Sequence, residues 1–207
     1  MALESLDFLG IENPYNQDGA ASAQLPLLAV RADYKWDTGL LSLGSSMAQL
    51  RWDGGGTGPS DTALQIDAVI GGRQFLGTDN YITWNVSYGE GSGENIMAFT
   101  GNDANAVLNS NGKLDTFIAK SAVAGFWHKW DDKWSTNFTY AYGWLDTPDS
   151  RGPTELKEGG VGHLNLIWRP VTQFSSGVEY MWGKRRAQND AIGSARRIQF
   201  MAKYEFK

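Results

Sequence analysis

The sequence has no cysteine, so neither a disulfide framework nor a thiolate metal site is available to it. Its two histidines, His128 and His163, have no partner at metal-ligand spacing. No stretch approaches the roughly 18 consecutive apolar residues of a transmembrane helix, and no helical periodicity of useful length occurs. These absences exclude a disulfide scaffold and a helical membrane protein, and they favour an all-β fold without a metal site.

Sequence motifs for catalysis are also absent. There is no GxSxG, HExxH or P-loop, and the GEGSGE stretch after Tyr88 lacks the βαβ context of a dinucleotide site. The net charge is −5 and no long basic run occurs, which argues against binding to nucleic acid. We therefore expect no enzyme activity, no cofactor and no nucleic-acid partner.

Aromatic residues are abundant and follow a period of two. In Lys133–Asp146 one face collects Trp134, Thr136, Phe138, Tyr140, Tyr142 and Trp144, and the other face collects Ser, Asn, Thr, Ala and Gly. A helix would scatter these aromatics around its axis, whereas a strand places them on one side. The same alternation recurs along the chain. It predicts about ten strands, near residues 3–12, 26–36, 40–52, 62–74, 81–88, 117–129, 134–145, 161–169, 173–183 and 195–206.

The predicted connections alternate strictly between short and long. The short ones follow Trp36, precede Tyr81, and lie at 130–133 and 170–172; the long ones lie near 13–25, 53–61, 89–116, 146–160 and 184–194. A transmembrane β-barrel has this pattern because its periplasmic turns are tight and its external loops are long. We therefore predict that residues 1–207 form one antiparallel barrel domain, or the C-terminal portion of one, with no separate soluble domain.

Tryptophans near the predicted strand ends fit the two aromatic girdles of such a barrel, where amphipathic rings prefer the headgroup level. The girdle candidates are Trp36, Trp84, Trp134, Trp144, Trp168 and Trp182. The alternative is a soluble all-β protein that binds carbohydrate on a Trp-rich face.

Four stretches resemble the DcaP-like porins, a family of trimeric outer-membrane channels associated with dicarboxylate uptake. They are DNYITWNVSYGEGSG at 79–93, HLNLIWRPV at 163–171, GVEYMWGKRR at 177–186 and ARRIQFMAKYEF at 195–206. The chain departs from the sixteen-strand family pattern in having about ten strands and in ending with Lys207 behind the terminal aromatic Phe206. The resemblance implies the C-terminal portion of a porin, or a shortened relative, in the outer membrane of a Gram-negative bacterium. It also implies a homotrimer in the full-length form and small anionic solutes such as dicarboxylates.

If the apolar face of each strand meets lipid, the opposite face lines the lumen. The predicted lining residues are Arg31, Asp33, Lys35, Arg73, Asn85, Asn137, His163, Asn165, Arg169, Glu179, Arg185, Arg197 and Lys203. An excess of basic groups near a constriction favours anions, and the arginine fork suits carboxylates. The expected function is passive diffusion of small hydrophilic solutes, with a weak preference for anions. The long loop at 89–116 is a candidate to fold into the channel.

Overall fold

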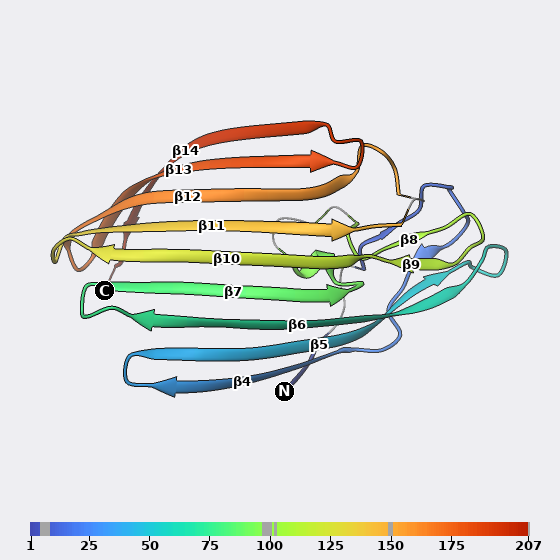
Figure 1. Ribbon diagram of the computed structural model, residues 1–207, viewed down its shortest axis with the longest axis horizontal. Coiled ribbons are helices and arrows are strands. Elements are labelled where there is room, and N and C mark those ends of the chain that lie inside the picture. Colours follow the sequence, from blue (N-terminus) through green and yellow to red (C-terminus); the bar gives the residue numbers. More distant parts are fainter. Residues whose placement is uncertain (5–8, 97–100, 102, 149–150, 207) are drawn as a thin grey trace.

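The computed structural model of the chain describes residues 1–4, 9–96, 101, 103–148 and 151–206. One large antiparallel sheet dominates it (Figure 1). In spatial order its strands are β1 (Ala2–Glu4), β4 (Leu27–Trp36), β5 (Gly39–Asp53), β6 (Asp61–Phe75), β7 (Asn80–Glu90), β10 (Ile118–Lys129), β11 (Trp134–Asp146), β12 (Leu156–Val171), β13 (Phe174–Ala187) and β14 (Ile192–Tyr204).

The nine strands from β4 to β14 on this path are the last nine that alternation predicts. They have 10 to 16 residues, so each is at least as long as the roughly 9–11 residues that a tilted strand needs to cross a bilayer. Their short connections gather at one end, on the left of Figure 1, which we name the turn end. The opposite end is the loop end. Within the described residues β14 pairs only with β13, so the sheet is open between β14 and the β1–β4 side.

The predicted first strand at 3–12 is wrong as a single element. Ala2–Glu4 pairs with β4, whereas β2 (Ile11–Glu12) belongs to a second sheet, with β8 (Ala106–Leu108) and β9 (Leu114–Thr116). Residues 5–8 between them lie outside the described part of the chain. Gly10, whose φ is +55°, immediately precedes β2, and this left-handed conformation is incompatible with a continuous strand.

The predicted long loop at 184–194 is also wrong. The strands β13 and β14 continue toward the loop end and leave only residues 188–191 between them, so the alternation of short and long connections is not strict. β12 likewise begins at Leu156, five residues earlier than predicted. In these extensions consecutive charged residues replace the apolar alternation, because a strand beyond the membrane has no apolar face to keep.

Buried side chains gather at the loop end rather than in the middle of the sheet. One cluster joins Leu9 and Ile11 to Leu50, Trp52 and Leu108; another surrounds Phe117. The small sheet β2–β8–β9 supplies most of the first cluster but only Val107 of the second, and the short strand β3 (Ala20–Ala21) pairs with β5 at the same end. The one helical element among the described residues is the short η1 (Gly93–Asn95), and no helix there is long and apolar enough to cross a membrane.

The two faces of the large sheet differ in kind. We name the face against which Ser92–Ile96 packs the inner face, and the other the outer face. One lateral row of outer-face partners reads Phe126, Phe138, Leu164, Tyr180 and Ile198 across five strands. These side chains are all exposed, up to 62% at Ile198. A continuous apolar surface of this extent would aggregate in water, and it suits contact with lipid.

Candidate functional site

The loop between β7 and β10 folds back onto the inner face. Gly91 N donates to Phe117 O and closes the loop at its base (2.8 Å). From its first turn, the Asn95 amide donates to Asp67 Oδ2 on the wall (2.6 Å), and Asp67 also accepts from Ser46 N and Ser46 Oγ. This carboxylate therefore fixes the segment against β6. Part of the predicted loop, residues 97–100 and 102, lies outside the described residues.

Cross-strand partners share a face, so the register assigns a face to each predicted lining residue. The inner face carries Arg31, Asp33, Lys35, Arg73, Asn85, Asn137, His163, Asn165, Glu179, Arg185, Arg197 and Lys203. Arg169 lies beside the register irregularity between Trp168 and Val171, so alternation does not fix its face.

Two of these basic side chains are neutralised locally. Arg31 Nε lies 2.8 Å from Asp33 Oδ1, and its Nη2 donates to Ser42 Oγ. Lys203 Nζ lies 2.6 Å from Glu205 Oε1. In the described part of the chain, Lys35, Arg73, Arg185 and Arg197 have no carboxylate within ion-pair distance. On the same face, Asp67 and Glu179 have no lysine or arginine at that distance in the described chain; Asp67 accepts hydrogen bonds from Ser46 and Asn95, and Glu179 lies near His163.

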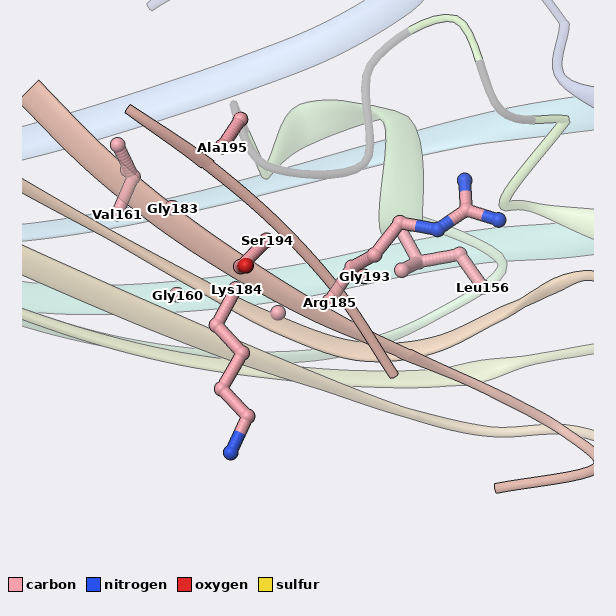
Figure 2. A pocket seen from close by; sticks show the side chains of 10 residues that line it. Leu156, Gly160, Val161, Gly183, Lys184, Arg185, Gly193, Ser194 and Ala195 are labelled. Carbon is pink, nitrogen blue, oxygen red and sulfur yellow. The ribbon is translucent and has the colours of Figure 1, made fainter. Parts of the chain in front are cut away.

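All four are exposed, and Arg185 differs from the others in its cross-strand neighbours. Both of its cross-strand neighbours, Gly159 and Gly193, lack a side chain. It lines a cavity of about 470 Å³ between β12, β13 and β14. Figure 2 shows Arg185 and Lys184 leaving β13 in opposite directions, as alternation requires. The guanidinium is therefore sterically accessible from the inner side of the sheet.

Three aromatic side chains on the inner face were not predicted. Phe75, Tyr81 and Trp127 are successive cross-strand neighbours at the turn end. The rings of Tyr81 and Trp127 stack with centroids 5.0 Å apart, and the Arg73 guanidinium lies 5.0 Å from the Tyr81 ring centroid. Tyr81, Thr83 and Asn85 are alternate residues of one strand, so alternation could have placed Tyr81 on the inner face. The prediction of aromatic girdles considered only rings on the outer face.

Beyond Trp127 the same lateral row becomes polar. Its next members are Asn137, Asn165 and Glu179. Asn165 Oδ1 accepts from Asn137 N (3.1 Å), and Asn165 Nδ2 donates to Glu179 Oε2 (3.4 Å). His163 Nδ1 lies 3.3 Å from Glu179 Oε1. This part of the wall is a hydrogen-bonded network rather than a set of separate charges.

The predicted girdle tryptophans all lie on the outer face, and four of them lie near strand ends. At the turn end, Trp134 and Trp168 are cross-strand partners with ring centroids 6.0 Å apart, and Trp36 ends β4. Toward the loop end, Trp144 lies near the end of β11. Trp84 and Trp182 lie further inside their strands than predicted, because β7 and β13 extend beyond the apolar pattern.

Charged side chains occupy the outer face toward the loop end, beginning with Arg196 and Lys184 on the last two strands and continuing in a lateral row. The row comprises Lys120, Glu158 and Arg186, with Trp144 between the first two. Lys120 Nζ lies 2.6 Å from Asp146 Oδ2, and Arg186 Nε lies 3.3 Å from Glu158 Oε1. Because such charges are costly in hydrocarbon, they agree with a border between lipid tails and headgroups toward the loop end.

The loop end is held by a buried ionic cluster. The Arg151 side chain is 1% exposed, its guanidinium lies 4.6 Å from the Phe117 ring centroid, and its Nε is 3.3 Å from Glu12 Oε2. Burial raises the pKa of the Glu12 carboxyl, although Arg151 acts in the opposite direction. Burial also raises the pKa of Asp103, and the nearby Glu94 raises it further. The cluster ties the segments around Glu12, Asp103 and Arg151 together. Three or more metal-ligating side chains do not converge anywhere in the described residues.

One solved structure shares this architecture. The crystal structure of the outer membrane channel DcaP of Acinetobacter baumannii aligns with a TM-score of 0.77 at 18% identity, over 93% of this chain and 54% of that one. The chain thus spans about half the length of that solved channel. The NanC porin aligns with a TM-score of 0.46 at 8% identity, over 92% of this chain and 98% of that one. No curated protein sequence matches.

The sequence model of the DcaP outer membrane protein family matches residues 2–206, which is nearly the whole chain. An outer-membrane location agrees with the apolar outer face and its charged border. That location sets aside the soluble carbohydrate-binding alternative. The chain belongs to the DcaP outer membrane protein family.

Proposed function

We propose that the inner face is the wall of a channel through which small hydrophilic anions, dicarboxylates among them, diffuse passively. One observation carries the proposal. Arg73, Arg185, Arg197 and Lys35 share the inner face without a carboxylate at ion-pair distance in the described chain, whereas only Asp67 and Glu179 of the wall carboxylates lack a lysine or arginine partner there. A wall with such an excess attracts anions. The family's channel structure supports the same role.

Arg185 should contribute most to the preference, because its two glycine neighbours leave its guanidinium accessible. An anion that passes about 7 Å from one unpaired charge in water gains roughly 0.6 kcal/mol before screening, a factor of about three. Salt screens this gain, since the Debye length shortens from about 10 Å at 0.1 M to about 3 Å at 1 M. Anion preference should therefore fall as the salt concentration rises.

The test is the reversal potential of the reconstituted channel in a planar bilayer under a salt gradient. Arg185→Gln should lower the ratio of anion to cation permeability by about two- to threefold at low salt. Arg186→Gln is the matched control, because the adjacent Arg186 lies on the outer face and pairs with Glu158. A cation preference that Arg185→Gln, Arg73→Gln and Arg197→Gln all leave unchanged would end the anion proposal and leave a general pore.

The proposal includes the homotrimer of the full-length form that the family resemblance implies. Chemical cross-linking in the outer membrane should give a ladder that ends at three subunits. Cross-linked samples that contain only single subunits would refute the homotrimer and leave the channel proposal unchanged.

A further inference from the structure

A cavity of about 410 Å³ lies between the folded-in loop segment and the inner face. Its roof is formed by Ser92, Asn95 and Ile96, and its floor by strands β5 to β7 and β10 to β12. The hydrogen bond from Asn95 to Asp67 holds the roof in place. A cavity of this volume falls in the range that binds small molecules.

The floor has an aliphatic centre. Val123, Ala141 and Val161 are successive cross-strand neighbours on β10, β11 and β12. Hydrogen-bonding side chains surround this patch: Asn85 beside Val123, the Ser87–Ser121 hydroxyl pair toward the loop end, and Thr139 and His163 toward the turn end. From strand spacing and residue rise, the patch measures roughly 10 Å by 13 Å.

The polar rim has unused hydrogen-bonding capacity. Within the described residues the Asn85 amide has no hydrogen-bond partner, so two donors and an acceptor are available to a bound solute. The hydroxyl oxygens of Ser87 and Ser121 lie 2.6 Å apart, so one hydroxyl donates to the other. The hydrogen of the accepting hydroxyl remains available to an external acceptor. Thr139 Oγ1 accepts only a long hydrogen bond from Asn137 (3.4 Å).

The cavity differs in charge from the rest of the wall. No lysine or arginine is among the described residues that line it, and its one carboxylate, Asp67, is satisfied by Ser46 and Asn95. A free carboxylate would gain no countercharge there and would be repelled by Asp67. An uncharged solute with an aliphatic face and a rim of hydroxyl groups matches both the floor and the border.

We propose that this cavity binds a small neutral polyol or monosaccharide, whose C–H face covers Val123 and Ala141 and whose hydroxyl groups bond to Asn85 and the serine pair. The inference rests on the proposed function only in requiring that water reaches the inner face. In this proposal anions interact with the unpaired arginines of the wall, whereas neutral hydroxylated solutes bind in the cavity beneath the loop.

The test is saturation-transfer NMR on the full chain in a detergent without a sugar headgroup, with methyl β-glucoside as the probe. Val123→Phe fills the cavity and should abolish the transfer. Val86→Phe is the matched control, because Val86 is exposed on the outer face of the neighbouring strand. Asn85→Leu should weaken binding about fivefold, as expected for the loss of a hydrogen-bonding amide. Succinate should not compete with the glucoside.

Glucoside binding that survives Val123→Phe, or that succinate displaces, would overturn the inference, as would the absence of transfer in the unmodified chain. The reversal-potential measurement separates this outcome from failure of the channel proposal. An anion-selective channel without glucoside binding refutes the cavity alone. Glucoside binding without anion preference refutes the selectivity alone.

Discussion

Replacing Gly162 on β12 by alanine should destabilise the folded chain, because the indole of Trp182 occupies the space that a Cβ would need. Its cross-strand partner on the outer face is Trp182, and a Cβ at Gly162 would lie 2.2 Å from Trp182 Cζ2. The ring also stacks near Phe138 and Tyr180, with centroids 6.2 Å and 5.7 Å away. Gly162→Ala must therefore displace the indole or the backbone, which typically costs about 1–3 kcal/mol.

Gly183 on the neighbouring strand provides the matched control. A Cβ there would lie 3.7 Å from its nearest neighbour, Gly160 O, which is an ordinary contact. Gly183→Ala should be neutral or should stabilise by about 0.4–1 kcal/mol, because alanine restricts the unfolded chain. The two substitutions add the same methyl group on adjacent strands, and only Gly162→Ala should lower the free energy of unfolding.

The assay is urea unfolding in detergent micelles, followed by tryptophan fluorescence and far-ultraviolet circular dichroism. Gly162→Ala should lower the unfolding midpoint, and its cost should shrink by about 1 kcal/mol or more in a Trp182→Ala background, where the space is vacant. Equal midpoints for Gly162→Ala and the unmodified chain would refute the reasoning. An equal cost in both backgrounds would show that the indole is not the cause.

Three further predictions concern the loop end, the faces of the sheet and the roof of the cavity. Arg151→Met should destabilise the loop end by up to about 3–5 kcal/mol near pH 7. Burial raises the pKa of Glu12, so the stability that this carboxyl contributes is present below its ordinary pKa. That stability is lost as the pH rises through the raised pKa of the folded state. Without Arg151, which lowers the pKa of Glu12, this pKa rises further. The penalty measured by urea unfolding should therefore be smaller near pH 4 than near pH 7, and a penalty independent of pH contradicts the account. A spin label at Tyr140 should be quenched by a lipid-soluble agent more strongly than one at Asn137, and the reverse order would mean that the faces of β11 are exchanged. Asp67→Ala should release the roof and speed hydrogen exchange at the backbone amides of η1, and unchanged exchange would show that the carboxylate does not hold it.

Alternation predicted the strands well where both faces of the sheet have distinct surroundings. In β11 every second residue from Trp134 to Trp144 meets the apolar side, so the period of two is complete. At the loop end the pattern fails, because water surrounds both faces there. Lys184, Arg185 and Arg186 are consecutive strand residues, yet their composition is that of a loop. The prediction of a loop at 184–194 therefore confused the border of the membrane with the end of the strand.

The faces of the candidate site were predictable, whereas the cross-strand surroundings of each side chain were not. Parity alone places Arg31 and Arg185 on the same side of the sheet. The ion pair of Arg31 with Asp33 joins residues two apart on one strand, so alternation could have suggested it. The surroundings of each charge depend on the neighbouring strand, which brings Ser42 beside Asp33 but brings only glycines beside Arg185. The sequence of a single strand contains no information about that register. The cavity beneath the loop was hidden for the same reason, since its rim comes from several strands and its roof from the loop.

The acidic net charge of the chain does not oppose an anion-attracting wall, because the two charges occupy different places. Many of the carboxylates lie in turns and loops, such as Asp131 and Asp132 in the turn after β10. A solute near Arg185 is separated from that turn by most of the length of a strand, which exceeds the Debye length of about 8 Å at physiological salt. The turn charges are therefore screened from the wall, whereas an accessible guanidinium on the wall acts at contact distance. The proposed solute preference therefore depends on the few unpaired side chains of the inner face, and the total charge of the sequence is a poor guide to it.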